Sequence, residues 1–175
     1  ERDWSSDVCS SDLMSEHRPP MEMAPAGVAP PISSDPPFHQ GARRLLLPAF
    51  APQAIAKLEA STRDFCEQLV ADMGDRDVVD GAVEYAQHIP VRVIANMLGF
   101  PQEDADTFRE FVHHTLEGVD LPEAERAEGF QRLFGYLEDQ VRDHIDHPRD
   151  DLTSYLLDAE MDGRPLAPEH VVRTI

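Results

Sequence analysis

The stretch Asp35–Pro52, with the sequence DPPFHQGARRLLLPAFAP, decides how the rest of the chain is interpreted. A helical pattern runs over Phe38–Leu47 and ends at Pro48, because proline lacks the N–H that a helix interior needs. Pro52 then suits the first turn of a second helix, where its missing N–H costs nothing. The stretch therefore predicts two helices separated by a short break.

Two donor side chains, His39 and Arg43, lie four residues apart in the first of these helices. Side chains at this spacing project from the same helix face, about one turn apart. An imidazole and a guanidinium on one face suit an anionic group with two carboxylate oxygens. On residue type alone, a surface pair that simply faces water is the alternative, and it stays open at this point.

Helical spacing continues to the end of the sequence, so we expect an all-α (mainly α) chain. The second helix is expected from Pro52 to a cap at Gly74, with a buried stripe made of Ile55, Leu58, Thr62, Phe65, Leu69 and Met73. Later helices are expected over Pro90–Leu98 with Gly99 as the stop, from after Pro101 to Glu117, over Glu123–Ile145, from a cap at Asp151 to near Gly163, and from Pro168 to Ile175. The expected inward side chains are Val91, Ile94, Ala95, Leu98, Phe108, Phe111, Val112, Thr115, Phe130, Leu133, Phe134, Leu137, Val141, Ile145, Leu152, Tyr155 and Leu156. Val78–Val79 is expected to form a short strand.

The first 37 residues are of a different character. Residues 14–37 carry seven of the 15 prolines and are predicted to form an extended loop, which leaves residues 38–175 as the helical part. Trp4–Leu13, WSSDVCSSDL, has no apolar period, and no export signal or metal motif fits it. A disordered tail fits the composition, but the stretch resembles the translation of a sequencing adapter. We therefore interpret residues 1–13 as an artefact, in which case Met14 need not be the true start.

Charge and composition exclude several classes of function. A net charge of −19 argues against nucleic-acid binding, and no apolar run approaches the ~18 residues that cross a membrane. With Cys9 set aside, Cys66 has no partner for a disulfide, which is compatible with a cytoplasmic location. Cys66 lies beside Phe65 and Leu69 on an apolar helix face and is predicted to be a buried small hydrophobe.

The remaining histidines carry little signal for metal binding. His113 and His114 follow Glu110 without a His-Glu-x-x-His pattern, so a zinc site is not expected. His144 and His147 are three apart and could chelate a metal together. Because Pro148 and aspartates surround them, we interpret this pair as a solvated helix end.

The run Asp-Pro-Pro-x-His-x-x-x-Arg, followed by Phe and Pro, resembles the helix-C region of bacterial cytochrome P-450 enzymes. HIPVRVIANMLGFPQEDADTFREF (His88–Phe111) is similar to helix E and the turn into helix F of that family, and RDDLTSYLLDAEMDGRPLAPEHVVRTI (Arg149–Ile175) to its run from helices G and H into helix I. The matches occur in the order and spacing of one continuous segment from about residue 24 onward. They imply a partial cytochrome P-450 fold, helices C to H plus the first turns of helix I.

The resemblance also implies residue roles. In the family, the matching His and Arg contact a haem propionate, so His39 and Arg43 are the expected cofactor-binding residues. Family members usually have Glu where this chain has Phe38. Arg44 and Lys57 are weak candidates for contact with a redox partner, and solvated charges are the alternative. By analogy, residues 21–29 and 104–117 would line the substrate pocket.

The resemblance implies a haem-thiolate monooxygenase that carries haem b, takes two electrons from a ferredoxin-type donor and inserts one oxygen atom from O₂ into a small organic substrate. Neither the Phe-x-x-Gly-x-x-x-Cys loop that supplies the iron ligand nor the acidic-Thr pair of helix I occurs up to Ile175, where the last helix is cut after two turns. The 175-residue chain is thus expected to be a fragment without catalytic or metal-ligating residues, inactive and poorly folded alone. The alternative is a self-contained helical binding or regulatory module without a cofactor.

Overall fold

The computed structural model describes residues 29–118, 120–161 and 163–175. The adapter-like residues 1–13 and most of the predicted pocket loop, residues 21–28, lie outside the described residues. The described chain is mainly α, as predicted, with a single pair of two-residue strands within these ranges.

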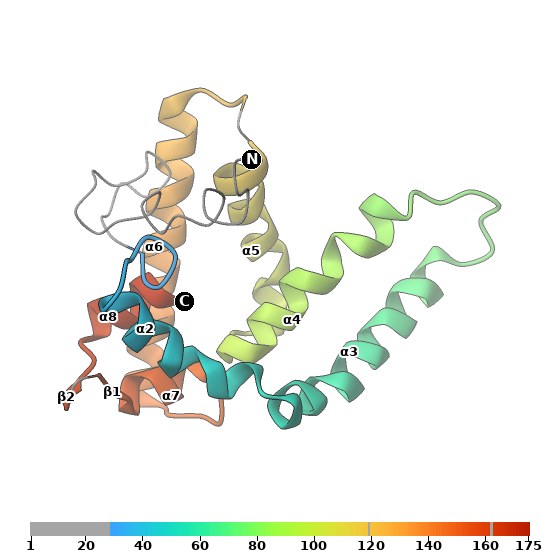
Figure 1. The fold of residues 1–175 in the computed structure, drawn as a ribbon. Helices are drawn as coiled ribbons and strands as arrows, with labels where there is room; N and C mark the ends of the chain where they lie inside the picture. The colour runs from blue at the N-terminus through green and yellow to red at the C-terminus, as the bar shows by residue number, and fades with distance from the viewer. Residues whose placement is uncertain (1–28, 119, 162) are drawn as a thin grey trace, which may run out of the picture.

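Figure 1 shows a cluster of helices around α6 and an arm made of α3 and the start of α4, whose end belongs to the cluster. The elements, in chain order, are α2 (Phe38–Leu46), η2 (Leu47–Phe50), α3 (Pro52–Met73), η3 (Ala82–Ala86), α4 (His88–Leu98), η4 (Gln102–Asp104), α5 (Ala105–Val112), η5 (His113–Glu117), α6 (Glu123–Asp146), α7 (Leu152–Asp158), β1 (Glu160–Met161), β2 (Arg164–Pro165) and α8 (Pro168–Thr174). η2 and η4 are 3₁₀ turns, whereas η3 and η5 are π-helical.

The predicted helix boundaries are confirmed where a cap defines them. Pro52 and Pro168 lie in the first turns of α3 and α8. Gly74 and Gly99 end α3 and α4 with φ of 61° and 73°, which a glycine adopts without a steric penalty. The Asp151 side chain caps α7 by accepting a hydrogen bond of 2.8 Å from the Ser154 N–H.

Two predictions about local structure are wrong, and two π-helical turns were missed. Val78–Val79 forms no strand, because this exposed loop has no neighbouring strand to pair with. α7 ends at Asp158 instead of near Gly163, and an antiparallel hairpin follows, with Gly163 at φ 73° in its turn. The π-helical turns η3 and η5 were not predicted, because π-helix occurs mostly as rare single turns that five residues of apolar spacing do not distinguish from α-helix.

The core surrounds α6. It combines Leu137 and Val141 of α6 with the end of α4, α7 and α8; its other buried members are Ala95, Leu98, Phe100, Leu152, Leu156, Leu166, Val171 and Val172. Next to it, Phe100 packs edge-on against Phe108 and Tyr136, with ring centroids 6.1 and 5.6 Å away. Burying these apolar groups is the main force that holds α4, α5, α6, α7 and α8 together.

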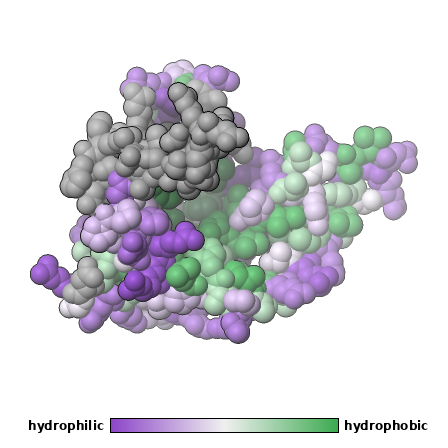
Figure 2. Space-filling view, viewed as in Figure 1, coloured by the Kyte–Doolittle hydropathy of each residue, from purple (hydrophilic) through white to green (hydrophobic). Residues whose placement is uncertain are grey.

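The apolar stripe of α3 is less buried than predicted. The stripe faces inward, but none of the 22 residues of α3 is buried, and Ile55 is exposed. Its apolar side lines an open groove of about 1100 Å³ with Tyr85 and Val93 on the opposite wall, and Figure 2 shows hydrophobic surface over this region. Tyr155 and Ile145 were also predicted to be buried and are exposed. Stripe residues become buried only where another element packs against them.

Candidate functional site

Helix α2 is fixed on one side by contacts with the cluster around α6. Ala42 is buried, and Leu45 packs against the core. Phe38 packs against His170 of α8, with ring centroids 5.8 Å apart. A Cβ on Gly41 would lie 3.3 Å from Met161 Sδ, so glycine allows α2 to approach β1 closely. These contacts determine which side of α2 remains available.

The available flank carries His39 and Arg43. With 3.6 residues per turn, these two positions lie only about 40° apart around the helix axis, outside the sector that packs on the core. His39 is half-buried and Arg43 is exposed. Among the described residues, neither side chain has a hydrogen-bond or ion-pair partner. The sequence prediction that the two share a helix face is consistent with this geometry.

The electrostatics of α2 differ from those of the whole chain. The chain carries a net charge of −19, but α2 has no acidic residue in its first turn and has Arg43 and Arg44 in its last. A cation near the C-terminal end of a helix is stabilised by the helix dipole. The flank is thus a local donor site, without a competing carboxylate on its own helix, and can bind an anion.

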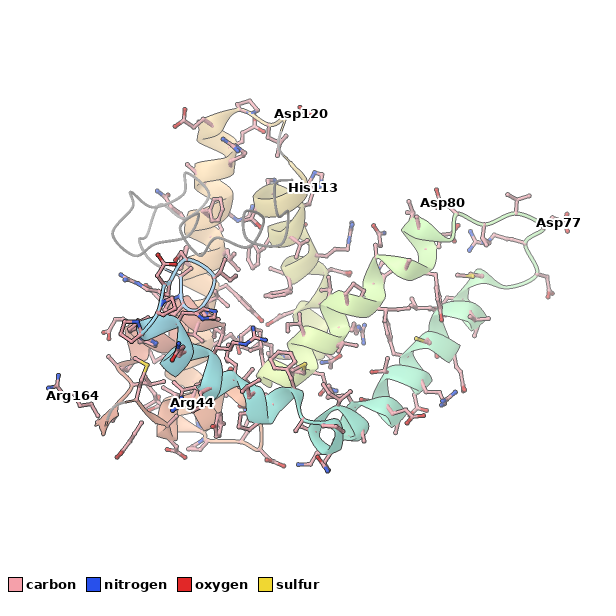
Figure 3. The ribbon with its side chains drawn as sticks, viewed as in Figure 1. Arg44, Asp77, Asp80, His113, Asp120 and Arg164 are labelled. Atoms are coloured by element: carbon pink, nitrogen blue, oxygen red, sulfur yellow. The ribbon has the colours of Figure 1, made fainter. Side chains whose placement is uncertain are left out.

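Arg44 projects from a different side of α2 than His39 and Arg43, because it lies about 100° further around the axis than Arg43. Figure 3 labels Arg44, which is exposed. Lys57, the other candidate for partner contact, lies 3.5 Å from the Asp150 carboxylate, and both side chains are largely exposed. The geometry of these two residues is compatible with the alternative prediction of solvated charges.

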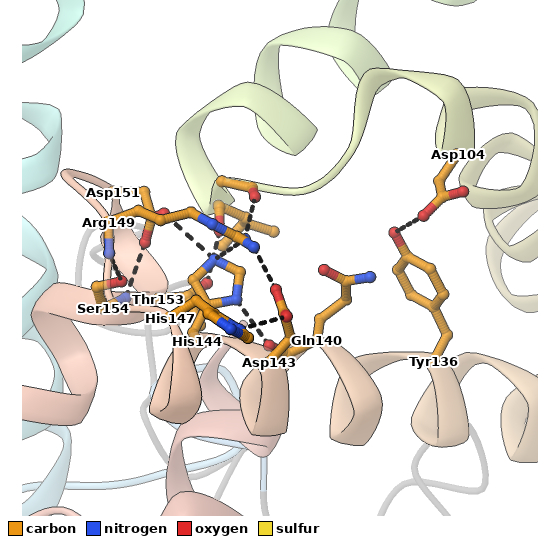
Figure 4. Close-up of polar contacts among 12 residues, drawn as sticks. Asp104, Tyr136, Gln140, Asp143, His144, His147, Arg149, Asp151, Thr153 and Ser154 are labelled. Carbon is orange, nitrogen blue, oxygen red and sulfur yellow. Dashed lines mark hydrogen bonds and ion pairs between the residues drawn. The ribbon is translucent and has the colours of Figure 1, made fainter.

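A second polar cluster joins the end of α6 to the start of α7, and sequence reasoning missed it (Figure 4). The prediction that His144 is part of a solvated helix end is wrong, because only 1% of His144 is exposed. Its Nε2 lies 3.2 Å from Asp151 Oδ2, and its Nδ1 lies 2.6 Å from the Gln140 carbonyl oxygen. The sequence does carry a signal for the burial of His144, because this residue lies three positions after the core residue Val141 on the same helix.

Arg149 and Thr153 extend this cluster to α4. Arg149 Nη1 donates to the Gly99 carbonyl at 3.1 Å, and Nη2 donates to Asp143. The fully buried Thr153 hydroxyl donates to the Leu98 carbonyl at 2.8 Å, so it satisfies one of the free carbonyls at the end of α4. The Arg149 guanidinium, and to a smaller extent His147, hold the pKa of Asp143 below its usual range.

The residues predicted to line a substrate pocket are described only in part. Residues 104–117 comprise α5 with a 3₁₀ turn before it and the π-helical η5 after it. Tyr136 of α6 donates a hydrogen bond of 3.0 Å to Asp104. Burial and this bond raise the pKa of the Tyr136 hydroxyl, so the phenol stays protonated at neutral pH. Asp104 and Tyr136 therefore tie the start of α5 to α6.

Cys66 is half-buried, which is less than its predicted burial. It lines the α3 groove with Tyr85, and a hydrogen bond with the thiol raises the pKa of the Tyr85 hydroxyl. Throughout the described residues, no group of three or more His, Cys, Asp or Glu side chains is arranged to hold a metal ion. His113 and His114 contact each other edge-on, and His114 Nδ1 lies 2.7 Å from the Glu110 carbonyl oxygen.

The described residues have the mainly α architecture of cytochromes P-450. Among solved structures, a mutant of the mixed-function P-450 MycG in complex with mycinamicin V matches with a TM-score of 0.73 and 29% identity, covering 81% of this chain and 36% of that one. A mutant of P-450 EryK in complex with erythromycin B matches with a TM-score of 0.74 and 26% identity, covering 93% of this chain and 41% of that one.

Curated relatives agree with the structures. The erythromycin C-12 hydroxylase of Saccharopolyspora erythraea is 35% identical over 142 residues, which are 77% of this chain and 35% of the hydroxylase. Cytochrome P-450(MEG) of Priestia megaterium is 29% identical over 146 residues, 81% of this chain and 36% of that enzyme. The chain is therefore recognised as a bacterial cytochrome P-450 sequence with a partial cytochrome P-450 fold, as its residues predicted.

The extent of these matches limits what they say about the whole protein. The chain spans little more than a third of the length of the curated relatives it matches. No family model matches the chain. Among the described helices, none combines the length and the apolar character that crossing a membrane requires.

Proposed function

We propose that this chain is part of a cytochrome P-450 monooxygenase, and that His39 and Arg43 bind a propionate of its haem b. The observation that carries the proposal is the His39–Arg43 flank, which has no partner among the described residues, on a helix of a chain similar to monooxygenases such as the erythromycin C-12 hydroxylase. Residues 14–37 would then form a proline-rich loop that leads into the helical residues 38–175, while residues 1–13 are an artefact.

The donor set of this flank fits a propionate. A guanidinium offers two parallel N–H groups to a carboxylate, and an imidazole can donate a third hydrogen bond. Neither group is committed to another partner among the described residues. Haem, when bound, supplies the activation of O₂ that places one oxygen atom in the organic substrate, with two electrons from a ferredoxin-type donor. The role of the α2 flank is to bind and orient the cofactor.

The other parts of the proposal follow from the same comparison. The substrate is a small organic molecule, as the names of the erythromycin and mycinamicin enzymes indicate for those proteins. Residues 104–117 would line its pocket. The 175-residue chain alone, without a cysteine ligand for the iron, would be an inactive fragment of a cytoplasmic enzyme.

Sequencing the source DNA beyond the codon for Ile175 tests the fragment. The expected frame continues into an acidic-Thr pair, a Glu-x-x-Arg motif and a glycine-flanked cysteine, and the restored protein gives the reduced carbon monoxide spectrum of a thiolate-ligated haem. A stop codon directly after Ile175 in clean sequence would contradict the fragment and favour the helical module.

Substitutions on the two sides of α2 test the propionate site in the restored protein. His39→Ala and Arg43→Ala should each weaken haem retention by roughly tenfold or more, because a hydrogen bond to a charged group contributes about 1.5–3 kcal/mol. Arg44→Ala is the matched control, since it removes a charge from the same helix but from another side. Equal losses from all three variants, or none from the first two, would refute the assignment; haem release during dialysis is the measurement.

A further inference from the structure

A second groove runs between α6 and α8, which lie against each other in the cluster (Figure 1). Its volume is about 690 Å³, and the half-buried rings of Phe130 and Phe134 form part of its lining. Ile145 also lines it and is 50% exposed, although its helical spacing predicted burial. The described residues therefore leave an apolar surface open along α6.

The charged residues in the lining of this groove balance, unlike those of the whole chain. The lining contains two glutamates, Glu138 and Glu169, and two arginines, Arg142 and Arg173, so their charges cancel. The chain carries a net charge of −19, so two copies repel each other over most of their surface. The lining of the groove is thus a place where a second copy can dock against both signs of charge.

One face of α6 carries Gly135, Glu138, Arg142 and Ile145 along the groove. With 3.6 residues per turn, these positions fall within about 80° of one another around the helix axis, so they form a single stripe. All four residues are exposed, and a Cβ added to Gly135 would meet nothing within 4 Å. The stripe therefore presents, in chain order, an open space, an acid, a base and an apolar side chain.

This order is self-complementary when two copies of α6 pack antiparallel about a twofold axis. An axis beside position 140 places Glu138 opposite Arg142 of the second copy, and Arg142 opposite its Glu138. The same register places Ile145 over the open space at Gly135 of the second copy. One register thus forms two charge-assisted pairs and fills two apolar spaces.

The existing contacts of the two charged residues do not compete strongly with this arrangement. Glu138 has no hydrogen-bond or ion-pair partner in the part of the chain that the structure describes. Arg142 donates to Asp139 on the same helix, and both side chains are more than half exposed. An exposed pair of this kind contributes little to stability, so Arg142 can turn to Glu138 of the second copy at small cost.

We propose that the groove between α6 and α8 binds a second copy of this chain, with the two α6 helices antiparallel and Glu138 paired with Arg142 across a twofold axis. Because α6 ends at Asp146, this register overlaps the helices over residues 134–146, a length of about 20 Å. An overlap of this length belongs to the small end of specific interfaces. The dimer is therefore weak and reversible, and it dissociates in dilute solution.

Analytical ultracentrifugation of the 175-residue chain over a range of concentrations tests for the dimer. At an ionic strength of about 0.15 M, repulsion between charges more than about 8 Å apart is largely screened. The mean mass should rise with concentration from that of one chain towards that of two, and no further, because a twofold interface closes. A mass that stays at one chain up to about 1 mM, or that rises beyond two chains, would overturn the proposal.

Charge exchange at the two paired positions identifies the interface. Glu138→Arg and Arg142→Glu each place like charges opposite one another and should each weaken the dimer about tenfold or more. The double variant with both substitutions places unlike charges opposite one another again and should restore it. Glu67→Arg is the matched control, because it makes the same change of charge at an exposed position in the α3 groove.

The control also separates the two grooves of the molecule. A dimer that Glu67→Arg weakens as much as Glu138→Arg does would overturn the proposal, and so would a double variant as weak as the single ones. All three positions are exposed, so their circular dichroism spectra should match that of the unmodified chain. A dimer that both single variants leave unchanged would equally exclude this register.

Gly135→Leu tests the apolar part of the register without weakening the helix. Leucine has a higher helix propensity than glycine, so α6 itself should become more stable. The added side chain occupies the space that Ile145 of the second copy needs, so the dimer should nevertheless weaken several-fold. Dimerisation unchanged or strengthened by Gly135→Leu would overturn the placement of Ile145 over Gly135.

Discussion

The two longest helices, α3 and α6, have similar lengths and different surroundings. α3 has 22 residues and buries none of them, whereas α6 has 24 and buries Gly129, Leu137, Val141 and His144. Both carry an apolar stripe at helical spacing. An apolar stripe therefore predicts which side of a helix faces inward, while the partners on that side determine how much free energy its burial contributes.

The polar contacts at α3 and α6 also differ in their exposure to water. Along α3 the contacts are exposed, as in the Arg63–Glu59 pair, and an exposed ion pair contributes little to stability. At the end of α6, the contacts of His144, Thr153 and Asp151 are shielded from water (Figure 4). A buried polar group that loses its partner costs more than an exposed one. Matched substitutions in the two regions should therefore differ consistently in their effect.

The largest difference is expected from apolar truncations. Leu156→Ala removes a side chain with 0% exposure from the core around α6 and should lower the free energy of unfolding by about 2–5 kcal/mol. Val70→Ala removes an apolar side chain of α3 that is 56% exposed and should change it by less than about 0.5 kcal/mol. Urea denaturation followed by circular dichroism measures both.

Equal losses for the two truncations would mean that α3 is covered in solution, for example by association of two chains through the groove. Repeating the measurement at several protein concentrations separates this outcome from a monomer, because association makes the midpoint depend on concentration. A loss confined to Leu156→Ala would confirm that the cluster around α6 carries the stability of the chain.

A smaller difference is expected from the two capping glycines. Gly99 has φ 73°, and an added Cβ would lie 2.9 Å from Asp151 Cβ, with still closer contacts to the Asp151 carboxylate. Gly99→Ala should therefore cost about 1–2 kcal/mol for the left-handed backbone and about 1–3 kcal/mol more for the displaced cap of α7. Gly74 has φ 61°, but an added Cβ would meet nothing within 4 Å.

Gly74→Ala has a backbone cost without a steric clash, because Gly74 has φ 61° and ψ −148°, a conformation open essentially only to glycine. Because α3 ends in an exposed loop, its last turn can unwind to relieve strain, so the loss should stay below that of Gly99→Ala. Thermal unfolding of both variants measures the difference. A larger loss for Gly74→Ala would show that the end of α3 is more rigid than its exposure indicates.

The capped and periodic parts of the fold were predictable from the sequence. Proline at a first turn, glycine at a C-terminal cap and aspartate before α7 act through local geometry, so Pro52, Gly99 and Asp151 placed three helix ends correctly. The strand expected at Val78–Val79 and the missed hairpin around Gly163 depend on pairing with another segment. Such pairing is not encoded in local spacing.

The same distinction applies to side chains outside the core. That His39 and Arg43 share one face of a helix could be predicted, because it follows from their spacing, while their role in binding haem stays a prediction. The burial of His144 could not be predicted from spacing alone, because it depends on Asp151, Arg149 and Phe100, which approach from elements that are separate in the sequence. Histidine beside aspartates is most often solvated, and only the packing of α7 against α6 reverses that expectation.

The smallest difference concerns two half-buried carboxylates, one in each region. A hydrogen bond from Arg149 lowers the pKa of Asp143 at the end of α6, and one from Arg76 lowers the pKa of Glu84 next to the α3 arm. A carboxylate whose pKa is lower in the fold than in the unfolded chain stabilises the fold above the unfolded pKa, and this contribution is lost as pH falls through the folded pKa. Both groups should therefore contribute to acid destabilisation below about pH 4, with the same sign.

The two carboxylates should affect different measurements. Arg149 connects Asp143 to the Gly99 carbonyl and to the buried cluster, so Asp143→Asn should reduce the acid-induced decrease of the global melting temperature by a small, measurable amount. Glu84 contacts Arg76 and the Asp80 amide within one exposed loop, so Glu84→Gln should change only local hydrogen exchange over residues 76–86. Asp77→Asn, in the same loop and exposed, controls for the loss of one charge (Figure 3). Glu84→Gln and Asp143→Asn could instead change the global melting temperature by the same amount. The arm and the cluster would then unfold as one unit, and α3 and α6 would differ in exposure but not in cooperativity.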